Sequence, residues 1–551
     1  MNSNKLLLRY SKVISRNLRN VPKFDDSEIL AQKVNLQDFK SKRSNFKKLP
    51  GDKSINYRNV IIRRLNFLKV GFITAVFTAT AAGSAFYLYR HNYENKSMIE
   101  DSLVKPALKK KKKKLSVPFI PLDSELGLSV PGLYYWGDRD FQDESWTGIP
   151  KRVKLFDGMI LKDVCLVNDR HNLVIDKNGD LFNWEISNER LKLVLSRQNL
   201  VHIKESNNCC YALNGKGQIL VIPLKEIDNL TDKFIKYENI TWFNIPWLKR
   251  ARYNLVIDTS KIFDRQRKES KIIQFDTGEN HLALVSNVGK AYTCSTGYSS
   301  NNDSKKKSFG QFGLPNFSQF DNIPPTNELF EVELLNNIVK MSCGKYHTLA
   351  IDSQGNLFTF GLNRNGQLGF LITYENEFLP YPRMISNRGI KQYFTGNRDT
   401  LSYIDINCCS ETSFITVLNP ITKQINYFSF GNGLNGELGN GHFKNSEFEP
   451  KLIKFLQDTN VTNWICNKDS NHIFVTTTDG IVKGWGLNDR GQIGTVQKTK
   501  KYKISQPITI PSILEPGIEF EKNLDSLLKL DGTRHKLSVG KESSCLYCVK
   551  N

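Results

Sequence analysis

The stretch that decides the fold is IVKMSCGKYHTLAIDSQGNLFTFGLNRNGQLG, residues 338–369. It contains three short runs of apolar, β-branched and aromatic residues, at 338–343, 347–351 and 357–360. Gly, Asn and Asp separate these runs, which is the pattern of strands joined by tight turns. The stretch therefore predicts a small antiparallel sheet that leads into the turn Gly366-Gln367-Leu368-Gly369.

This unit repeats along the chain. Its turn begins at Gly310, Gly366, Gly436 and Gly491, with separations of 56, 70 and 55 residues. The first half of the unit begins near Val164, Val201, Ile272, Val339, Ile404, Trp464 and Leu537. The second half occupies Leu133–Gly137, Leu181–Glu185, Gln218–Ile222, Lys290–Gly297, Asn356–Gly361, Ile425–Gly431 and Ile481–Gly486. A recurrence of this length indicates stacked or radial units.

The two ends of the repeat region carry complementary halves. The region opens with a second half at 133–137 and ends with an unpaired first half at 537–548. Pairing these halves would close a ring and leave no open edge strand. We therefore predict an all-β, seven-bladed β-propeller over residues 131–551. The alternative, an open solenoid, would carry capping repeats at its ends.

The residues from Cys343 through His347, Phe360 and Gly361 to Gly369 closely resemble the repeat of the regulator of chromosome condensation family. The resemblance extends over residues 131–551 and is strong near 340, 430 and 485, whereas the units near 165 and 200 lack the Gly-Gln-Leu-Gly turn. It implies a seven-bladed propeller with protein-binding faces. It leaves the partner open, because one fold hosts many functions.

The N-terminal residues carry targeting features. Residues 1–24 contain no acid, and the basic residues at 5, 9, 12, 16 and 19 would lie on one face of a helix. This pattern is typical of a mitochondrial presequence, and an arbitrary basic tail is the alternative. We assign residues 1–50 to a targeting presequence and basic tail, and residues 51–69 to a basic juxtamembrane segment.

Residues 70–89, VGFITAVFTATAAGSAFYLY, form an uncharged run of 20 residues. That length suffices to cross about 30 Å of hydrocarbon, so we predict one transmembrane helix, with a buried helix as the alternative. Residues 90–130 are predicted to be a Lys-rich linker. Its six lysines at 109–114 would lie against an anionic membrane surface, and a nuclear localisation signal is the competing interpretation.

The charge is concentrated outside the repeats. Residues 1–115 contain 26 Lys and Arg against 8 Asp and Glu, whereas the remaining 436 residues contain 51 against 47. A propeller that binds nucleic acid is expected to hold a basic face. The nearly neutral repeat region therefore favours protein partners, and we predict that nucleic acid is not a partner.

Neither the cysteines nor the histidines form a recognisable reaction centre. Cys343, Cys408 and Cys466 lie at equivalent strand ends, and His281 and His347 occupy one repeat position, with His472 near it. Cys545 and Cys548 have the spacing of a redox motif, but side chains three apart in a strand point to opposite faces. We predict no enzyme activity, no catalytic residues, no cofactor and no metal site.

Long connections between the repeats are the expected places for recognition, because a rigid scaffold presents them. The connection at 223–271 carries an aromatic and arginine mixture that is enriched in binding hot spots. The candidate protein-binding residues are Trp242, Phe243, Trp247, Arg250 and Arg252. The alternative is that these side chains pack on the propeller itself.

A presequence, one span and this repeat together resemble a family of fungal mitochondrial inner-membrane proteins implicated in the assembly of respiratory complex III. The resemblance implies an assembly factor whose partners are inner-membrane respiratory-complex subunits or other assembly factors. The alternatives are a guanine-nucleotide exchange factor for an organellar GTPase and a factor that binds mitochondrial ribosomes or RNA. The excess of Lys and Arg at 90–114 over 58–69 favours the matrix side, whereas a stop-transfer route would favour the intermembrane space.

Overall fold

The computed structural model describes residues 130–138, 150–168, 170–239, 249–264, 266, 268–298, 307–318, 322–396, 400–495, 502–510 and 528–550. The predicted presequence, the juxtamembrane segment, the span at 70–89 and the linker up to residue 129 lie outside the described residues. In the part of the chain that is described, no helix has both the length and the apolar character needed to cross a bilayer.

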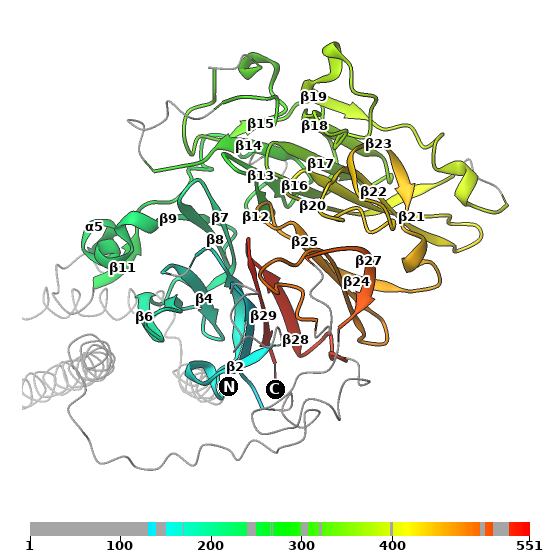
Figure 1. Cartoon of the computed structure of the whole chain (residues 1–551). Coiled ribbons are helices and arrows are strands. Elements are labelled where there is room, and N and C mark those ends of the chain that lie inside the picture. Colours follow the sequence, from blue (N-terminus) through cyan, green and yellow to red (C-terminus); the bar gives the residue numbers. More distant parts are fainter. Residues whose placement is uncertain are drawn as a thin grey trace, which may run out of the picture. The chain divides into compact units, whose positions relative to one another are not determined.

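Seven small antiparallel sheets are arranged in a ring, so the predicted propeller is confirmed (Figure 1). Blade 1 consists of β3 (Leu161–Cys165), β4 (Asn172–Asp176), β5 (Leu181–Glu185) and β6 (Arg190–Leu195). Blade 2 consists of β7 (Leu200–Ser206), β8 (Cys209–Asn214) and β9 (Ile219–Pro223). Blade 3 consists of β12 (Ile272–Thr277), β13 (His281–Ser286), β14 (Ala291–Ser295) and β15 (Phe330–Glu331). Blade 4 consists of β16 (Ile338–Cys343), β17 (His347–Asp352), β18 (Leu357–Leu362) and β19 (Phe378–Met384). Blade 5 consists of β20 (Ser402–Cys409), β21 (Thr412–Leu418), β22 (Ile425–Gly433) and β23 (Lys444–Leu452). Blade 6 consists of β24 (Val461–Ile465), β25 (His472–Thr477), β26 (Val482–Leu487) and β27 (Lys503–Thr509). Blade 7 consists of β28 (His535–Val539), β29 (Ser543–Cys548), β1 (Leu133–Gly137) and β2 (Lys151–Val153).

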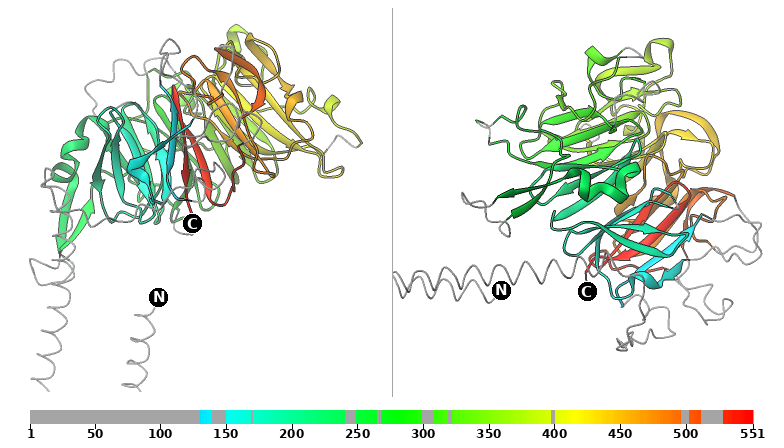
Figure 2. Two further views of the ribbon diagram at one scale, coloured as in Figure 1. Left: turned by 60° about the horizontal axis from the view of Figure 1, so that its bottom comes forward. Right: turned by 90° about the vertical axis from the view of Figure 1, so that its left-hand side faces the viewer.

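Blade 7 closes the ring with strands from both ends of the repeat region, as predicted. β1 pairs antiparallel with β29, from Leu133 opposite Tyr547 to Gly137 opposite Ser543. Figure 2 shows these two strands, cyan and red, side by side. The last strands of the chain therefore hold the first strand of the propeller in place.

Blade 2 departs from the four-strand plan. Its sheet has three strands, and a short segment around Val256 takes the fourth position through a bridge to Leu220. Between β9 and this segment the chain forms the 3-10 helix η3 (Leu224–Asn229), the helix α5 (Leu230–Phe234) and the hairpin of β10 (Ile235–Asn239) and β11 (Lys249–Tyr253). The hydroxyl of Tyr253 donates to the carbonyl of Val221 at 2.7 Å and ties the hairpin to the blade.

The core lies between adjacent blades. The second strand of each blade is covered on both faces, so strands such as β13 and β25 are buried throughout and contain few charged residues. Large aromatic residues fill the space between sheets, as where Trp485 meets Phe414 and Trp464 at ring distances of 6.1 and 5.9 Å. The outer strands β19, β23 and β27 have mixed burial and contain proline, as edge strands do.

The repeated glycine turns contact the next blade, which explains why they recur. The indole nitrogens of Trp485 and Trp136 donate to the turn carbonyls of Glu437 and Gln492 at 2.7 and 2.8 Å. Gly366 has a φ of +81°, and a side chain there would meet the backbone of the next blade's outer strand at 2.6 Å. Glycine is therefore required for both the turn and the close approach.

Candidate functional site

The inner strands surround a central cavity of about 320 Å³. Its lining mixes apolar, thiol and charged side chains and comes from blades 2 to 6. The lining residues are Val201, His202, Lys204, Leu213, Ile273, Gln274, Phe275, Asp276, Lys340, Met341, Ser342, Cys343, Asn407, Cys408, Trp464, Cys466, Asn467 and Lys468.

Charged side chains on the inner strands join neighbouring blades. Lys204 of β7 pairs with Asp276 of β12 at 2.5 Å, and Lys340 of β16 pairs with Asp405 of β20 at 2.6 Å. Asp276 also accepts the backbone N–H of Cys343 at 3.0 Å. Burial alone would raise the pKa of the Asp276 carboxyl, but the ammonium of Lys204 and these hydrogen bonds outweigh it and hold that pKa below its usual range.

Lys468 closes one end of the channel. It follows β24 in blade 6, yet its ammonium lies 2.8 Å from the carboxylate of Glu205 in blade 2 and 3.7 Å from that of Glu279 beyond β12 in blade 3. Asp469 provides a third carboxylate. Only 3% of the Lys468 side chain is exposed. Burial by itself would lower the Lys468 pKa, but attraction to the three carboxylates prevails and raises it, so the lysine stays charged.

We expect Lys468→Met to destabilise the propeller by about 3–5 kcal/mol, because it leaves the buried Glu205 carboxylate without its partner. Urea unfolding followed by tryptophan fluorescence measures the change. The matched control is Lys541→Met, which removes a lysine that is 71% exposed. The double variant Lys468→Met, Glu205→Gln should recover part of the loss, and a loss no smaller than that of Lys468→Met alone would contradict the cross-channel pair.

The repeated histidines link neighbouring blades through side-chain hydroxyls. His281, His347 and His472 all begin the second strand of their blades, so His472 shares the position and does not merely lie near it. Their Nε2 atoms lie 3.0, 3.0 and 2.8 Å from the hydroxyls of Thr348, Ser413 and Ser544, each in the following blade.

The hydroxyls fix the histidine tautomer. The hydroxyl of Thr348 donates to the carbonyl of Gln311, and that of Ser413 donates to the carbonyl of Gln367, at 3.2 and 2.8 Å. The proton must therefore sit on Nε2 of His281 and His347, since the imidazole has to donate. Burial lowers the pKa of all three histidines to about 3, so they are neutral at physiological pH.

The predicted structural role of the aligned cysteines agrees with their burial. Cys343 and Cys408 are buried and Cys466 is partly buried, at the ends of successive inner strands. Burial raises the pKa of the Cys466 thiol to about 12 and also raises the pKa values of the Cys343 and Cys408 thiols, so none is a thiolate at neutral pH. Among the described residues, no group of three or more His, Cys, Asp and Glu side chains is placed to hold a metal ion.

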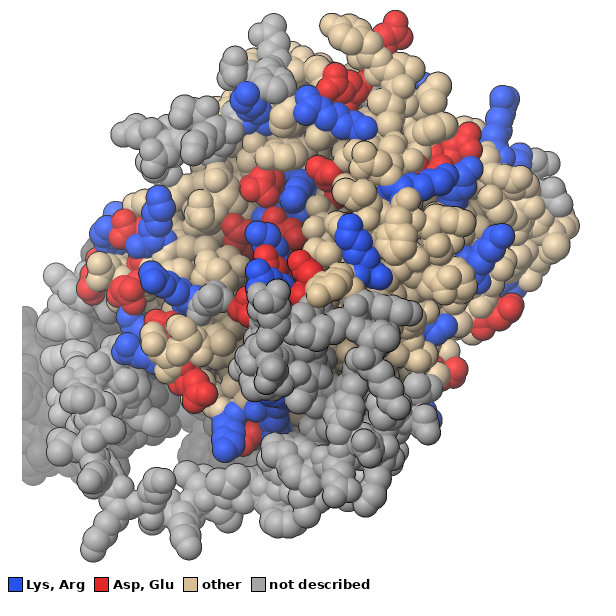
Figure 3. Space-filling model, in the orientation of Figure 1, with Lys and Arg blue, Asp and Glu red and all other residues tan. Residues whose placement is uncertain are grey.

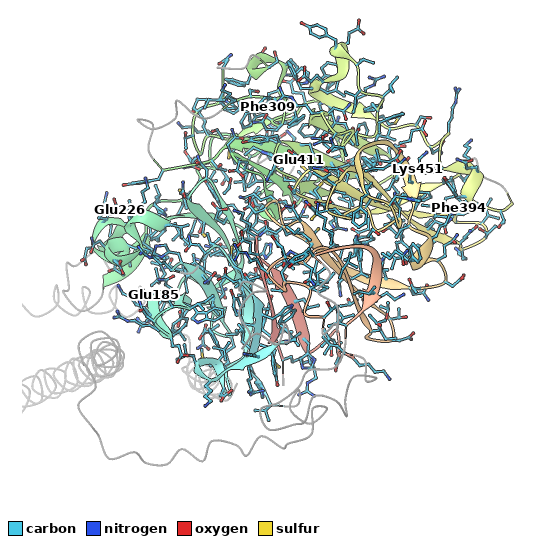
Figure 4. All side chains as sticks on the ribbon, in the orientation of Figure 1. Glu185, Glu226, Phe309, Phe394, Glu411 and Lys451 are labelled. Atoms are coloured by element: carbon cyan, nitrogen blue, oxygen red, sulfur yellow. The ribbon has the colours of Figure 1, made fainter. Side chains whose placement is uncertain are left out.

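The predicted binding loop is only partly described. Trp242, Phe243 and Trp247 lie outside the described residues, and Arg250 and Arg252 lie on β11. Arg252 is exposed. The hairpin that carries the loop follows α5 in the chain, and Glu226, which precedes α5, is labelled in Figure 4. Lys233 of α5 donates to the carboxylate of Glu226 at 2.5 Å.

Acidic and basic side chains are mixed over the viewed face of the propeller, with no single field of one sign (Figure 3). Ion pairs of the propeller include Arg364–Glu377 in blade 4 and Lys444–Glu447 in blade 5, at 2.8 and 2.9 Å. This distribution agrees with the near balance of charge in the repeat region. Such a face offers many polar contacts and no continuous basic track for a phosphate backbone.

The sequence did not predict the ion pairs that charged side chains form across the central channel. Glu205 and Lys468 are separated by more than 250 positions, and neither belongs to the glycine pattern of the repeat. One sequence feature pointed to these pairs: equivalent positions of inner strands carry opposite charges in successive repeats, as Lys340 and Asp405 do. That alternation does not specify which blades face each other across the channel.

Comparison with known proteins agrees with this architecture. The family model of the regulator of chromosome condensation (RCC1) repeat matches residues 338–367. The chain is 39% identical over 472 residues to Protein FMP25, mitochondrial, of Saccharomyces cerevisiae, covering 81% of this chain and 78% of that protein. It is 22% identical over 251 residues to the human probable E3 ubiquitin-protein ligase HERC6, of which it covers 21%.

Among solved structures, a chain in the crystal structure of Kap60 bound to yeast RCC1 (Prp20) aligns with a TM-score of 0.50 at 14% identity, over 81% of this chain and 96% of that chain. This likeness concerns the fold alone. The long match to the mitochondrial yeast protein and the repeat itself together decide the relationship. The chain belongs to the family of RCC1-repeat propellers that includes yeast FMP25.

Proposed function

We propose that this chain is a mitochondrial inner-membrane protein that binds other proteins through its propeller and assists the assembly of respiratory complex III. The observation that carries the mitochondrial location is the 39% identity to a mitochondrial yeast protein over 81% of the chain. The presequence pattern in residues 1–24 supports the same compartment. The assembly role rests on the resemblance of the whole arrangement to complex III assembly proteins.

The architecture favours binding over chemistry. The residues around the channel are tied to one another: Lys204, Asp276, Lys340 and Asp405 form ion pairs, and the buried histidines hold hydroxyls of the next blade. A ring held in this way presents loops of different length on a rigid frame. The mixed charge of Figure 3 suits protein partners better than nucleic acid.

We further propose that residues 70–89 anchor the chain and that the propeller lies on the matrix side. The span and its flanks are a sequence-based assignment, with four Lys and Arg at 58–69 and nine at 90–114. The partner contact is assigned to the β10–β11 hairpin and its loop, where Trp242, Phe243, Trp247, Arg250 and Arg252 are clustered in the sequence.

We expect loss of the protein to lower the amount of mature complex III while mitochondrial translation stays intact, because the proposed defect lies after synthesis of the subunits. Native gels measure the complex, and pulse labelling measures translation. Complex III precursors should also co-purify with the full chain. Rescue by a Trp242→Ala, Trp247→Ala variant should be weaker than rescue by the control Tyr374→Ala, which changes a side chain that is 96% exposed.

Other outcomes would identify the alternatives. An exchange factor should accelerate nucleotide release from a purified organellar GTPase, and a ribosome or RNA factor should cause a general fall in organellar translation with salt-sensitive RNA binding. Normal complex III in cells that lack the protein would overturn the proposed function.

A further inference from the structure

Four exposed, β-branched aliphatic side chains surround one end of the central channel. Val201, Ile273, Val339 and Ile404 are each the extra residue in a β-bulge at the beginning of an inner strand, in blades 2 to 5. Their exposed fractions run from 45% to 59%. A bulge turns its extra residue out of the ladder, which explains why these side chains are not buried with the rest of the strand. We call this set the aliphatic rim.

The rim has the properties of a binding surface. Val201 and Ile273 also line the cavity of about 320 Å³, so the apolar ring adjoins a concave site. The remaining blades change its character: blade 6 has the polar Thr462 at the bulge position, blade 1 has Lys162 there, and the inner strand of blade 7 carries the exposed Lys536. The channel end is therefore aliphatic over blades 2 to 5 and cationic over blades 7 and 1.

The chain enters the propeller at this same end of the channel. β1 and β28 are both antiparallel to β29, so they run in the same direction. The first residue of β1, Leu133, therefore lies at the end where β28 and the other inner strands begin, which is the end that carries the rim. β1 stands two strand spacings, about 10 Å, from β28. Val130 therefore lies at the rim end of the propeller, beside blade 7.

Those residues have a composition that matches the rim. Residues 115–128, LSVPFIPLDSELGL, contain seven aliphatic or aromatic side chains, two acids and no basic residue, and they follow the lysine run 109–114. Asp123 and Glu125 come five to seven residues before Val130, within about 25 Å of extended chain. Residues 117–122 come eight to 13 residues before Val130, so an extended chain can carry them about 28 to 45 Å from it. The acids can thus reach the lysines of blades 7 and 1, and the apolar residues can continue across the channel to blades 2 to 5.

We propose that residues 115–128 bind the aliphatic rim of their own propeller, with Phe119 and Ile120 against blades 2 to 5 and with Asp123 and Glu125 facing Lys162 and Lys536. This contact would cover apolar side chains that otherwise face water.

The test uses the full chain in its native membrane, with a photo-reactive benzoylphenylalanine in place of Val339. After illumination and tryptic digestion, mass spectrometry should find Val339 joined to the peptide that contains residues 115–128. The matched control places the same group at Ile421, which is also 59% exposed but lies on the loop between β21 and β22 and not on an inner strand. The cross-link from Ile421 should be at least about tenfold weaker.

Two further sets of variants test the apolar and the charged contacts separately. Phe119→Ser with Ile120→Ser should reduce the Val339 cross-link by at least about tenfold. Asp123→Lys with Glu125→Lys should also reduce it, and adding Lys162→Glu with Lys536→Glu should restore it. Proteolytic resistance of the propeller in each variant reports that it remains folded.

The proposal would be overturned by a Val339 cross-link to another protein or to lipid, by equal cross-linking from Ile421, or by no cross-link at all. It would also be overturned if the Phe119 and Ile120 variant linked as well as the natural sequence. The cross-linking result does not depend on the amount of complex III, so failure of this proposal can be distinguished from failure of the proposed function.

Discussion

A chain that ends at residue 534 should not form a propeller. The deletion removes β28 and β29, leaving β1 and β2 without the strand to which β1 pairs over five residues. Residues lost with it include Leu546 and Tyr547, which are buried among blades 6, 7 and 1. An open edge strand and the exposed side walls of blades 1 and 6 should favour aggregation over loss of one activity.

The measurement is the fraction of soluble chain and the cooperativity of its thermal unfolding. Losing several buried large side chains at about 2–5 kcal/mol each exceeds the whole stability of a typical domain, so a cooperative transition should disappear. Lys541→Ala, an exposed change in the turn between β28 and β29, should leave solubility and melting unchanged. A soluble, cooperatively melting chain of residues 1–534 would show that the ring does not depend on this closure.

The free energy of unfolding should fall steeply as the pH drops from 7.5 to 5. His281, His347 and His472 have pKa values lowered to about 3 in the folded protein because they are buried. In the unfolded chain a histidine takes up its proton near pH 6.5, so the unfolded state binds more protons between these values. The stability that the neutral imidazoles contribute is present above pH 6.5 and is lost as the pH falls toward 3. Three histidines together give a slope of up to about 4 kcal/mol per pH unit.

Urea unfolding at a series of pH values measures this slope. His347→Gln should reduce it by about a third, at a cost in stability near neutral pH because the bond to the Ser413 hydroxyl is lost or altered. His442→Gln, on an exposed loop, should retain the full pH dependence. A free energy of unfolding that is constant between pH 7.5 and 5 would mean that the three imidazoles are not held neutral.

Much of the fold could be predicted because each blade is encoded locally. The strands β16, β17 and β18 are each six residues long and are separated by turns that contain Gly and Asn, so their positions do not depend on distant residues. The complementary halves at 133–137 and 537–548 indicated the closure for the same reason. The need for glycine at position 344 also arises from a nearby residue, because a side chain there would overlap the imidazole of His347.

The outer strands and blade 2 were harder to predict. β19, β23 and β27 contain proline and charged residues and face water on one side, so they lack a clear alternation of apolar and polar residues. In blade 2 the β10–β11 hairpin is inserted where the fourth strand would follow, and the segment at Val256 replaces that strand. No local pattern distinguishes such an insertion from a long loop.

The sequence by itself determined the number of blades, the order of their strands and the way the ring closes, because short apolar runs and glycine turns specify structure over a few residues. Only the tertiary structure decided which polar groups meet at the centre. Lys468 reaches Glu205 and Glu279 because blade 6 faces blades 2 and 3 across a narrow channel. The aliphatic rim likewise exists only because four equivalent bulges are brought to one end of that channel. Such contacts depend on the curvature of the closed ring, which no short stretch of the chain encodes.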